Sequence, residues 1–154
     1  MHTRARPGPD DKGETLLELM IAVAIMGIVV VAIVGGIATS IMMSDIHRKQ
    51  ATAGAYVRNY AETVVAYVAA GTPASKANFA GSSSSPDYSP STVGFTAPAG
   101  GFVASVSSVW CWDDGSKKFI SSCAAASAVQ QVTLNIASSD SRASETLLVI
   151  VRKP

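Results

Sequence analysis

A run of twenty-five residues without an ionisable side chain, from Leu19 to Met43, most limits what this chain can fold into. As a helix it would be about 37 Å long, because each residue rises 1.5 Å, whereas the hydrocarbon core of a bilayer is about 30 Å thick. A secretory signal has an apolar core of only about 7–15 residues. The run therefore predicts a membrane-spanning helix rather than a secretory signal.

One carboxylate, that of Glu18, precedes the apolar run. An ionised side chain in a membrane helix costs roughly 2.5–3.5 kcal/mol at the helix centre, and less near an end. A local interpretation is that Thr15 and Glu18 form an S/T-x-x-E capping box, where the helix dipole favours a negative charge. The other interpretation is that Glu18 pairs with a positive charge from a neighbouring molecule. These residues alone leave both open.

The residues before the run form a charged leader, residues 1–13, with three basic side chains: Arg4, Arg6 and Lys12. Basic residues beside a membrane helix favour the cytoplasmic side, although Arg48 and Lys49 on the far side weaken this bias. We therefore expect a single-pass protein of the cytoplasmic membrane, with the N-terminus inside and residues 44–154 outside.

The two cysteines of the chain, Cys111 and Cys123, both lie in this downstream part. In an oxidising compartment, such a pair is typical of one disulfide. It would close a short loop and contribute roughly 3 kcal/mol in the chain-entropy model. We expect it to clip a hairpin or the segment that follows the hairpin.

Residues 44–70 are predicted to continue the helix in amphipathic form. Five apolar side chains recur at i, i+3, i+4, i+7 and i+11: Val57, Tyr60, Ala61, Val64 and Val68. Such a stripe packs against another layer of structure. Tyr56 and Tyr67 are interpreted as residues at the core or its rim. The sequence Gly71-Thr72-Pro73 is expected to end the helix.

The rest of the chain divides into a loop and a sheet. Residues 71–101 are rich in Gly, Ala, Ser and Pro and are expected to form a long surface loop that buries little. Residues 102–154 alternate between apolar and polar, which predicts four short antiparallel strands near 102–110, 117–120, 129–137 and 146–152. The expected fold class is α+β, with a long N-terminal helix, apolar then amphipathic, packed on a small antiparallel sheet.

The order of Gly13, Glu14-Thr15-Leu16-Leu17-Glu18 and a long apolar helix resembles the class III signal of type IV pilins and pseudopilins. The resemblance implies that a prepilin peptidase cuts between Gly13 and Glu14 and methylates the new amine of Glu14. Glu18 would then be the family's glutamate at the fifth mature position. The first mature residue is usually phenylalanine or methionine, whereas Glu14 resembles the variant of pilin-like proteins in some Gram-positive bacteria.

The resemblance also gives roles to other parts of the chain. Residues 14–43 would form the half of the helix that lies in the membrane and later in the filament core. Three glycines in it, Gly27, Gly35 and Gly36, would let the helix unwind and lengthen on assembly. Without the resemblance, they are ordinary close-packing glycines of a membrane helix. The implied partners are the prepilin peptidase, like or related pilin subunits, and the assembly platform in the membrane.

The sequence predicts a structural subunit rather than an enzyme. Its two histidines, His2 and His47, lie outside the predicted sheet, so no Ser or Cys nucleophile has a histidine beside it there. We expect no metal site and no cofactor, and 12 basic against 11 acidic side chains indicate no nucleic-acid surface. Lys117, Lys118 and the two tryptophans could touch an anionic polymer or sugar, but a packed hairpin is the simpler interpretation. The alternative function is an unprocessed single-pass membrane protein with an outer binding or sensing domain.

Overall fold

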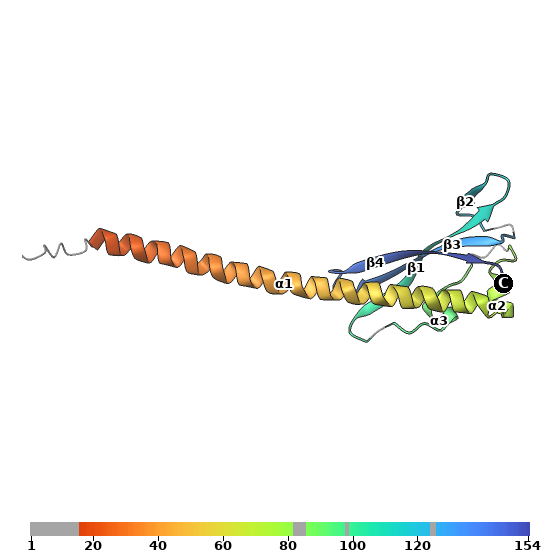
Figure 1. The fold of residues 1–154 in the computed structure, drawn as a ribbon, viewed down its shortest axis with the longest axis horizontal. Helices are drawn as coiled ribbons and strands as arrows, with labels where there is room; N and C mark the ends of the chain where they lie inside the picture. The colour runs from red at the N-terminus through yellow and green to blue at the C-terminus, as the bar shows by residue number, and fades with distance from the viewer. Residues whose placement is uncertain (1–15, 82–85, 98, 124–125) are drawn as a thin grey trace, which may run out of the picture. The chain divides into compact units, whose positions relative to one another are not determined.

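The computed structural model describes residues 16–81, 86–97, 99–123 and 126–154. The chain divides into two compact units, residues 1–43 and 44–154. Helix α1 (Leu16–Ala69) begins in the first unit and ends in the second (Figure 1). The two units are therefore described separately.

The described part of the first unit is the apolar half of α1. Every side chain from residue 16 to residue 43 is exposed, and Leu16, Val31 and Ile28 keep more than two thirds of their surface. A helix that is apolar all round is stable only where other apolar material surrounds it. Within the described residues, α1 is the one helix long and apolar enough to cross a membrane.

The second unit contains a four-stranded sheet in the order β2-β1-β3-β4, with all neighbouring strands antiparallel. The strands are β1 (Phe102–Asp113), β2 (Lys118–Ile120), β3 (Val129–Ser138) and β4 (Ser144–Arg152). The long N-terminal helix packs on this sheet, so the predicted fold class is confirmed: α+β, and pilin-like (Figure 1).

The central strand β3 shows why these residues form a sheet with one covered face. Val132, Leu134 and Ile136 are fully buried, and the residues between them are only partly covered. β1 follows the same alternation until its register shifts between Val106 and Ser108. The extra residue of this bulge changes which side chains face the core, so that Cys111 also points inward and is buried.

The amphipathic half of α1 covers this inner face of the sheet. All five residues of the predicted stripe are buried, and Ala53 extends the stripe by one turn: Ala53, Val57, Tyr60, Ala61, Val64 and Val68. They join Val132, Leu134 and Ile136 in one core. Tyr56 and Tyr67 are partly buried against this core, as expected of rim residues. The helical period of the sequence therefore predicted the packing surface correctly.

The prediction that residues 71–101 bury little is wrong. The segment contains two short helices, α2 (Pro73–Ala77) and α3 (Pro90–Val93). It also adds four large side chains to the core: Phe79, Tyr88, Val93 and Phe95. The composition of the segment is dominated by small residues, but these few large ones are placed where α1 and the sheet leave room. The ring of Phe95 stacks on Tyr60 at a centroid distance of 4.6 Å.

A chain of buried hydrogen bonds ties this segment to α1 and to β3. Tyr60 donates its hydroxyl proton to the carbonyl oxygen of Tyr88 at 2.6 Å, and Tyr88 donates to Oε1 of Gln130 at 2.6 Å. Gln130 in turn donates from Nε2 to the carbonyl of Asn78 at 2.7 Å. Burial raises the pKa of Tyr60 to about 12, so its hydroxyl remains a donor. In the low dielectric of the core, such bonds specify one arrangement of the chain.

A second link joins the first turns of α1 in this unit to the turn between β3 and β4. Nζ of Lys49 lies 2.6 Å from Asp140 and 3.0 Å from Asp45. The hydrogen bond from Lys49 holds the pKa of the Asp140 carboxyl well below its usual range. Because these groups are partly open to solvent, the link fixes position more than it adds stability.

Replacing Tyr60 by Phe should lower the free energy of unfolding by about 1–3 kcal/mol, because the buried carbonyl of Tyr88 would lose its donor. Denaturant titration of the full chain in detergent, followed by tryptophan fluorescence, measures the change. Tyr56→Phe is the matched control, since Tyr56 is only partly buried and packs its ring near Phe102 at 6.5 Å. Equal losses in the two variants would contradict the role given to the Tyr60 hydroxyl.

Candidate functional site

The candidate site is the exposed apolar half of α1, with Glu18 in its first turn. Glu18 is exposed to solvent in the isolated chain. A negative charge in the first turn is favoured by the helix dipole, so its position has a local explanation. Gly13 and Glu14, predicted as the cleavage and methylation sites, and Thr15 of the capping box lie outside the described residues.

The three glycines lie within the continuous helix. A Cβ atom added at Gly27, Gly35 or Gly36 would meet no atom within 4 Å. Close packing among the described residues therefore does not require these glycines. Glycines on a membrane helix let a second backbone approach closely, and they also weaken the helix by about 1 kcal/mol each relative to alanine. Their predicted role in unwinding stays a prediction.

The structure adds Thr39 to this region. Its hydroxyl donates to the carbonyl oxygen of Gly35, four residues earlier, at 3.0 Å. Such a bond competes for the carbonyl with the normal helical bond and often bends a helix. The sequence signal was a threonine four residues after Gly35 inside an apolar run, but a single threonine carries no periodic pattern that would predict such a bond.

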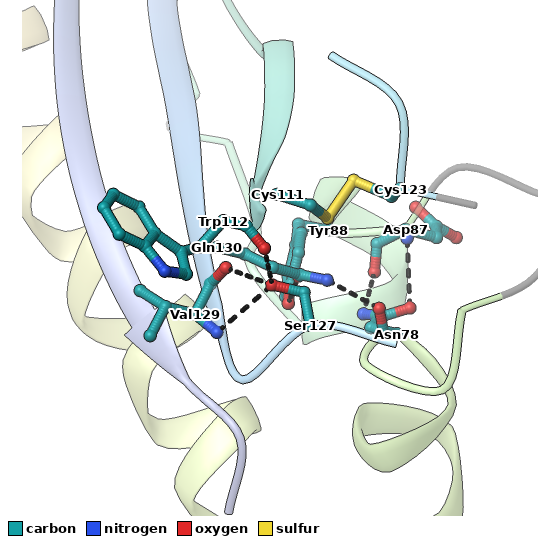
Figure 2. Close-up of a disulfide and its surroundings, with 9 residues drawn as sticks. All are labelled: Asn78, Asp87, Tyr88, Cys111, Trp112, Cys123, Ser127, Val129 and Gln130. Carbon is teal, nitrogen blue, oxygen red and sulfur yellow. Dashed lines mark hydrogen bonds between the residues drawn. A yellow bond between two sulfur atoms is a disulfide. The ribbon is translucent and has the colours of Figure 1, made fainter. Parts of the chain in front are cut away.

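The disulfide lies in the other unit. The structure joins Cys111 in β1 to Cys123, which follows β2, with 5.3 Å between their Cα atoms (Figure 2). Only 3% of Cys111 is exposed. The bond ties the segment that leaves β2 back to β1, at the end of β1 that pairs with both β2 and β3.

Side chains around the disulfide hold the same end of the unit. The Ser127 hydroxyl lies 3.0 Å from the carbonyl oxygen of Trp112 and 2.7 Å from that of Val129 (Figure 2). The amide of Asn78 donates to the carbonyl of Asp87 at 2.9 Å and accepts from its backbone N–H at 3.1 Å. Sequence reasoning missed Ser127 and Asn78, because isolated polar residues in loops carry no periodic signal.

In the hairpin of β1 and β2, Trp112 and Lys117 make contacts within the hairpin itself. The ring of Trp112 packs edge-on against Phe119 at 5.3 Å, and its Nε1 donates to Asp114 at 3.1 Å. Lys117 also lies 3.5 Å from Asp114. These groups are used within the hairpin, which favours the interpretation of a packed hairpin.

The described residues contain no group of three or more His, Cys, Asp or Glu side chains that could hold a metal ion. His47 lies on an exposed position of α1, and His2 is outside the described residues. The candidate site is therefore the exposed apolar half of α1.

Comparison with known protein families finds a motif that overlaps the apolar half of α1. Residues 9–43 match the model of the prokaryotic N-terminal methylation motif, which is the type IV prepilin signal. The motif indicates a type IV pilin-like prepilin, and such a motif suggests a structural subunit rather than an enzyme. No curated protein and no solved structure matches the chain. The motif and the long apolar helix together fit membrane anchoring.

Replacing Cys111 and Cys123 together by serine should lower the free energy of unfolding by roughly 2–3 kcal/mol, because the unfolded chain would regain the entropy of an open loop. Thermal unfolding of the full chain in detergent measures the loss. Wild-type protein treated with a reductant is the control and should match the double variant. A variant as stable as the oxidised wild type would show that the bond contributes nothing to the sheet.

Proposed function

We propose that this protein is a structural subunit of a type IV pilus or of a type II secretion-like filament. The observation that carries the proposal is the match of the prepilin motif to residues 9–43, most of which form a helix with every described side chain exposed. Such a helix needs two apolar environments in turn: the bilayer before assembly, and the helices of other subunits afterwards.

Processing would convert the precursor into a subunit competent for assembly. The prepilin peptidase, on the cytoplasmic side, cuts after Gly13 and methylates the amine of Glu14. A free α-amine titrates at about 7.7–8.0, so it carries a positive charge at neutral pH, and methylation to a secondary amine keeps that charge. The mature chain then begins four residues before Glu18.

Glu18 would set the register of neighbouring helices. When two apolar helices pack with an axial stagger, the amine of one subunit can reach the Glu18 carboxylate of the other. A buried ion pair adds little net stability, but a buried charge without its partner is costly, so a wrong stagger is rejected. The pairing therefore serves alignment more than strength.

The remaining partners follow from the same route. Like or related pilin subunits supply the neighbouring helices, and an assembly platform in the membrane moves each subunit out of the bilayer. The N-terminus faces the cytoplasm, residues 44–154 lie outside, and the finished filament is extracellular or spans the envelope. Gly27, Gly35 and Gly36 let the helix adjust its length during this transfer.

The second candidate is an unprocessed single-pass membrane protein whose outer domain binds a ligand or senses the envelope. It shares the apolar helix and the disulfide-bonded outer unit, and it requires no cleavage. The state of the N-terminus separates the two candidates.

Mass analysis of the protein from the membrane fraction should find a chain that starts at Glu14 and carries one added methyl group. The expected N-terminal peptide lacks the thirteen leader residues. A strain without the prepilin peptidase is the control and should retain the leader. If every copy in the peptidase-positive strain keeps residues 1–13, the single-pass membrane protein is the correct function.

Replacing Glu18 by Ala should leave cleavage intact and reduce incorporation into filaments at least about tenfold, since an unpaired buried amine costs several kcal/mol. The amount of subunit in sheared filaments, relative to the membrane pool, measures incorporation. Glu62→Ala is the matched control, because Glu62 is also an exposed glutamate of α1 but lies outside the apolar half. Normal filament yield from Glu18→Ala would rule out the pairing with the amine.

A further inference from the structure

Strand β4 forms an open edge of the sheet. It spans nine residues, Ser144–Arg152, and within the described part of the chain only β3 pairs with it. The opposite edge, β2, has only three residues and begins with Lys118, directly after Lys117; natural sheets protect an edge with short strands and lysines. β4 contains no proline, lysine or bulge and includes the run Leu147 to Val151. Such an edge is a template for another strand.

The hydrogen-bond pattern shows which backbone groups are directed outward. Lys153 donates to the carbonyl of Ala128, and Ser138 donates to that of Ala143, so the odd-numbered residues of β4 bond to β3. In an antiparallel ladder the intervening residues then direct N–H and C=O away from the neighbour. These are the residues at positions 146, 148, 150 and 152.

Two of these residues, Leu148 and Ile150, carry apolar side chains on the face away from α1. Leu148 is 51% exposed and Ile150 is 55% exposed. Near Ile150, the edge borders a hollow of about 160 Å³ lined by Val65 of α1 and by Arg152. Unpaired backbone groups and uncovered apolar side chains therefore coincide along one edge.

The charges at the two ends of β4 indicate what covers it. Glu145 is the second residue of the strand, and Arg152, the last residue, is followed by Lys153. In an antiparallel pair of two such strands, the acidic start of each lies beside the basic end of the other. A parallel pair would place like charges side by side, which destabilises a sheet. The described residues give Glu145 and Lys153 no ion-pair partner within the chain.

We propose that β4 is a self-association surface, at which two copies of this chain pair their β4 strands antiparallel into one eight-stranded sheet. The register places Glu145 opposite Lys153 of the second copy, with the two-fold axis at Val149. It brings Leu148 opposite Ile150, and the outward groups of both strands bond to one another. This pairing does not depend on the filament function.

The two-fold axis reverses the direction of the second sheet. Subunits along one filament all point the same way, so this contact cannot join neighbours within a filament. It would instead join copies of opposite orientation, such as those of two filaments lying side by side.

Disulfide trapping tests the register in the full chain, which is kept in detergent. A position-specific crosslink is needed because copies can also associate through α1, so a dimer alone would not report on β4. Leu148→Cys is mixed with Ile150→Cys. Opposite residues in a hydrogen-bonded pair lie about 5.5 Å apart at Cα, within disulfide reach. The mixture should give at least about fivefold more crosslinked dimer than either variant alone, where the thiols lie about 8–9 Å apart. Val103→Cys, 60% exposed on the same face but in β1, is the control and should not crosslink with either.

Exchanging the charges of Glu145 and Lys153 tests whether the partner of β4 is a second, antiparallel β4 strand. When both cysteine variants also carry Glu145→Lys, crosslinking should fall at least about fivefold, because lysines then face each other at both ends. When one carries Glu145→Lys and the other Lys153→Glu, crosslinking should return, which also shows that these substitutions leave the fold intact. Absent crosslinking, equal crosslinking with and without mixing, or no response to the charge exchange would each overturn the proposal.

Discussion

The apolar surface of the first half of α1 is the constraint on which the rest of this protein depends. Nothing in the described chain covers residues 16–43. Apolar surroundings must therefore come from outside the chain, both before and after any assembly. A bilayer and a bundle of like helices both satisfy this need. Under the proposed pairing, the single carboxylate at the start of the helix distinguishes them, because lipid offers it no counter-charge, whereas the amine of a neighbouring processed subunit would.

The second half of the same helix, in contrast, is covered on one side by its own chain. It has a sheet to pack on, and its buried stripe, with Tyr60 near the middle, forms one side of a small core. The hydrogen bonds from Tyr60 through Tyr88 to Gln130 fix the connecting segment at the same time. The second half of α1 therefore packs within the folded unit of residues 44–154, whereas the first half needs apolar surroundings that the described chain does not provide.

The sequence predicted those features that have a period. The helical stripe from Val57 to Val68 and the alternation of β3 were read correctly, because burial on one face repeats every few residues. The burial of Phe79, Tyr88 and Phe95 was missed, since single large residues among Gly, Ser and Pro look like a loop. Gly13 and Glu14 lie outside the described residues, so the candidate site is supported by the family motif and by chemistry rather than by geometry.

Asn78 is a brace whose side chain pairs with both backbone groups of Asp87. These bonds close the base of the segment between residues 78 and 87, whose first residue, Phe79, is buried in the core. Lengthening a closed loop is inexpensive, about 0.6 kcal/mol for each doubling. An insertion placed after Phe79 within this segment therefore costs little, so the chain can diversify there, or carry an inserted tag, while Phe79 keeps its place in the core.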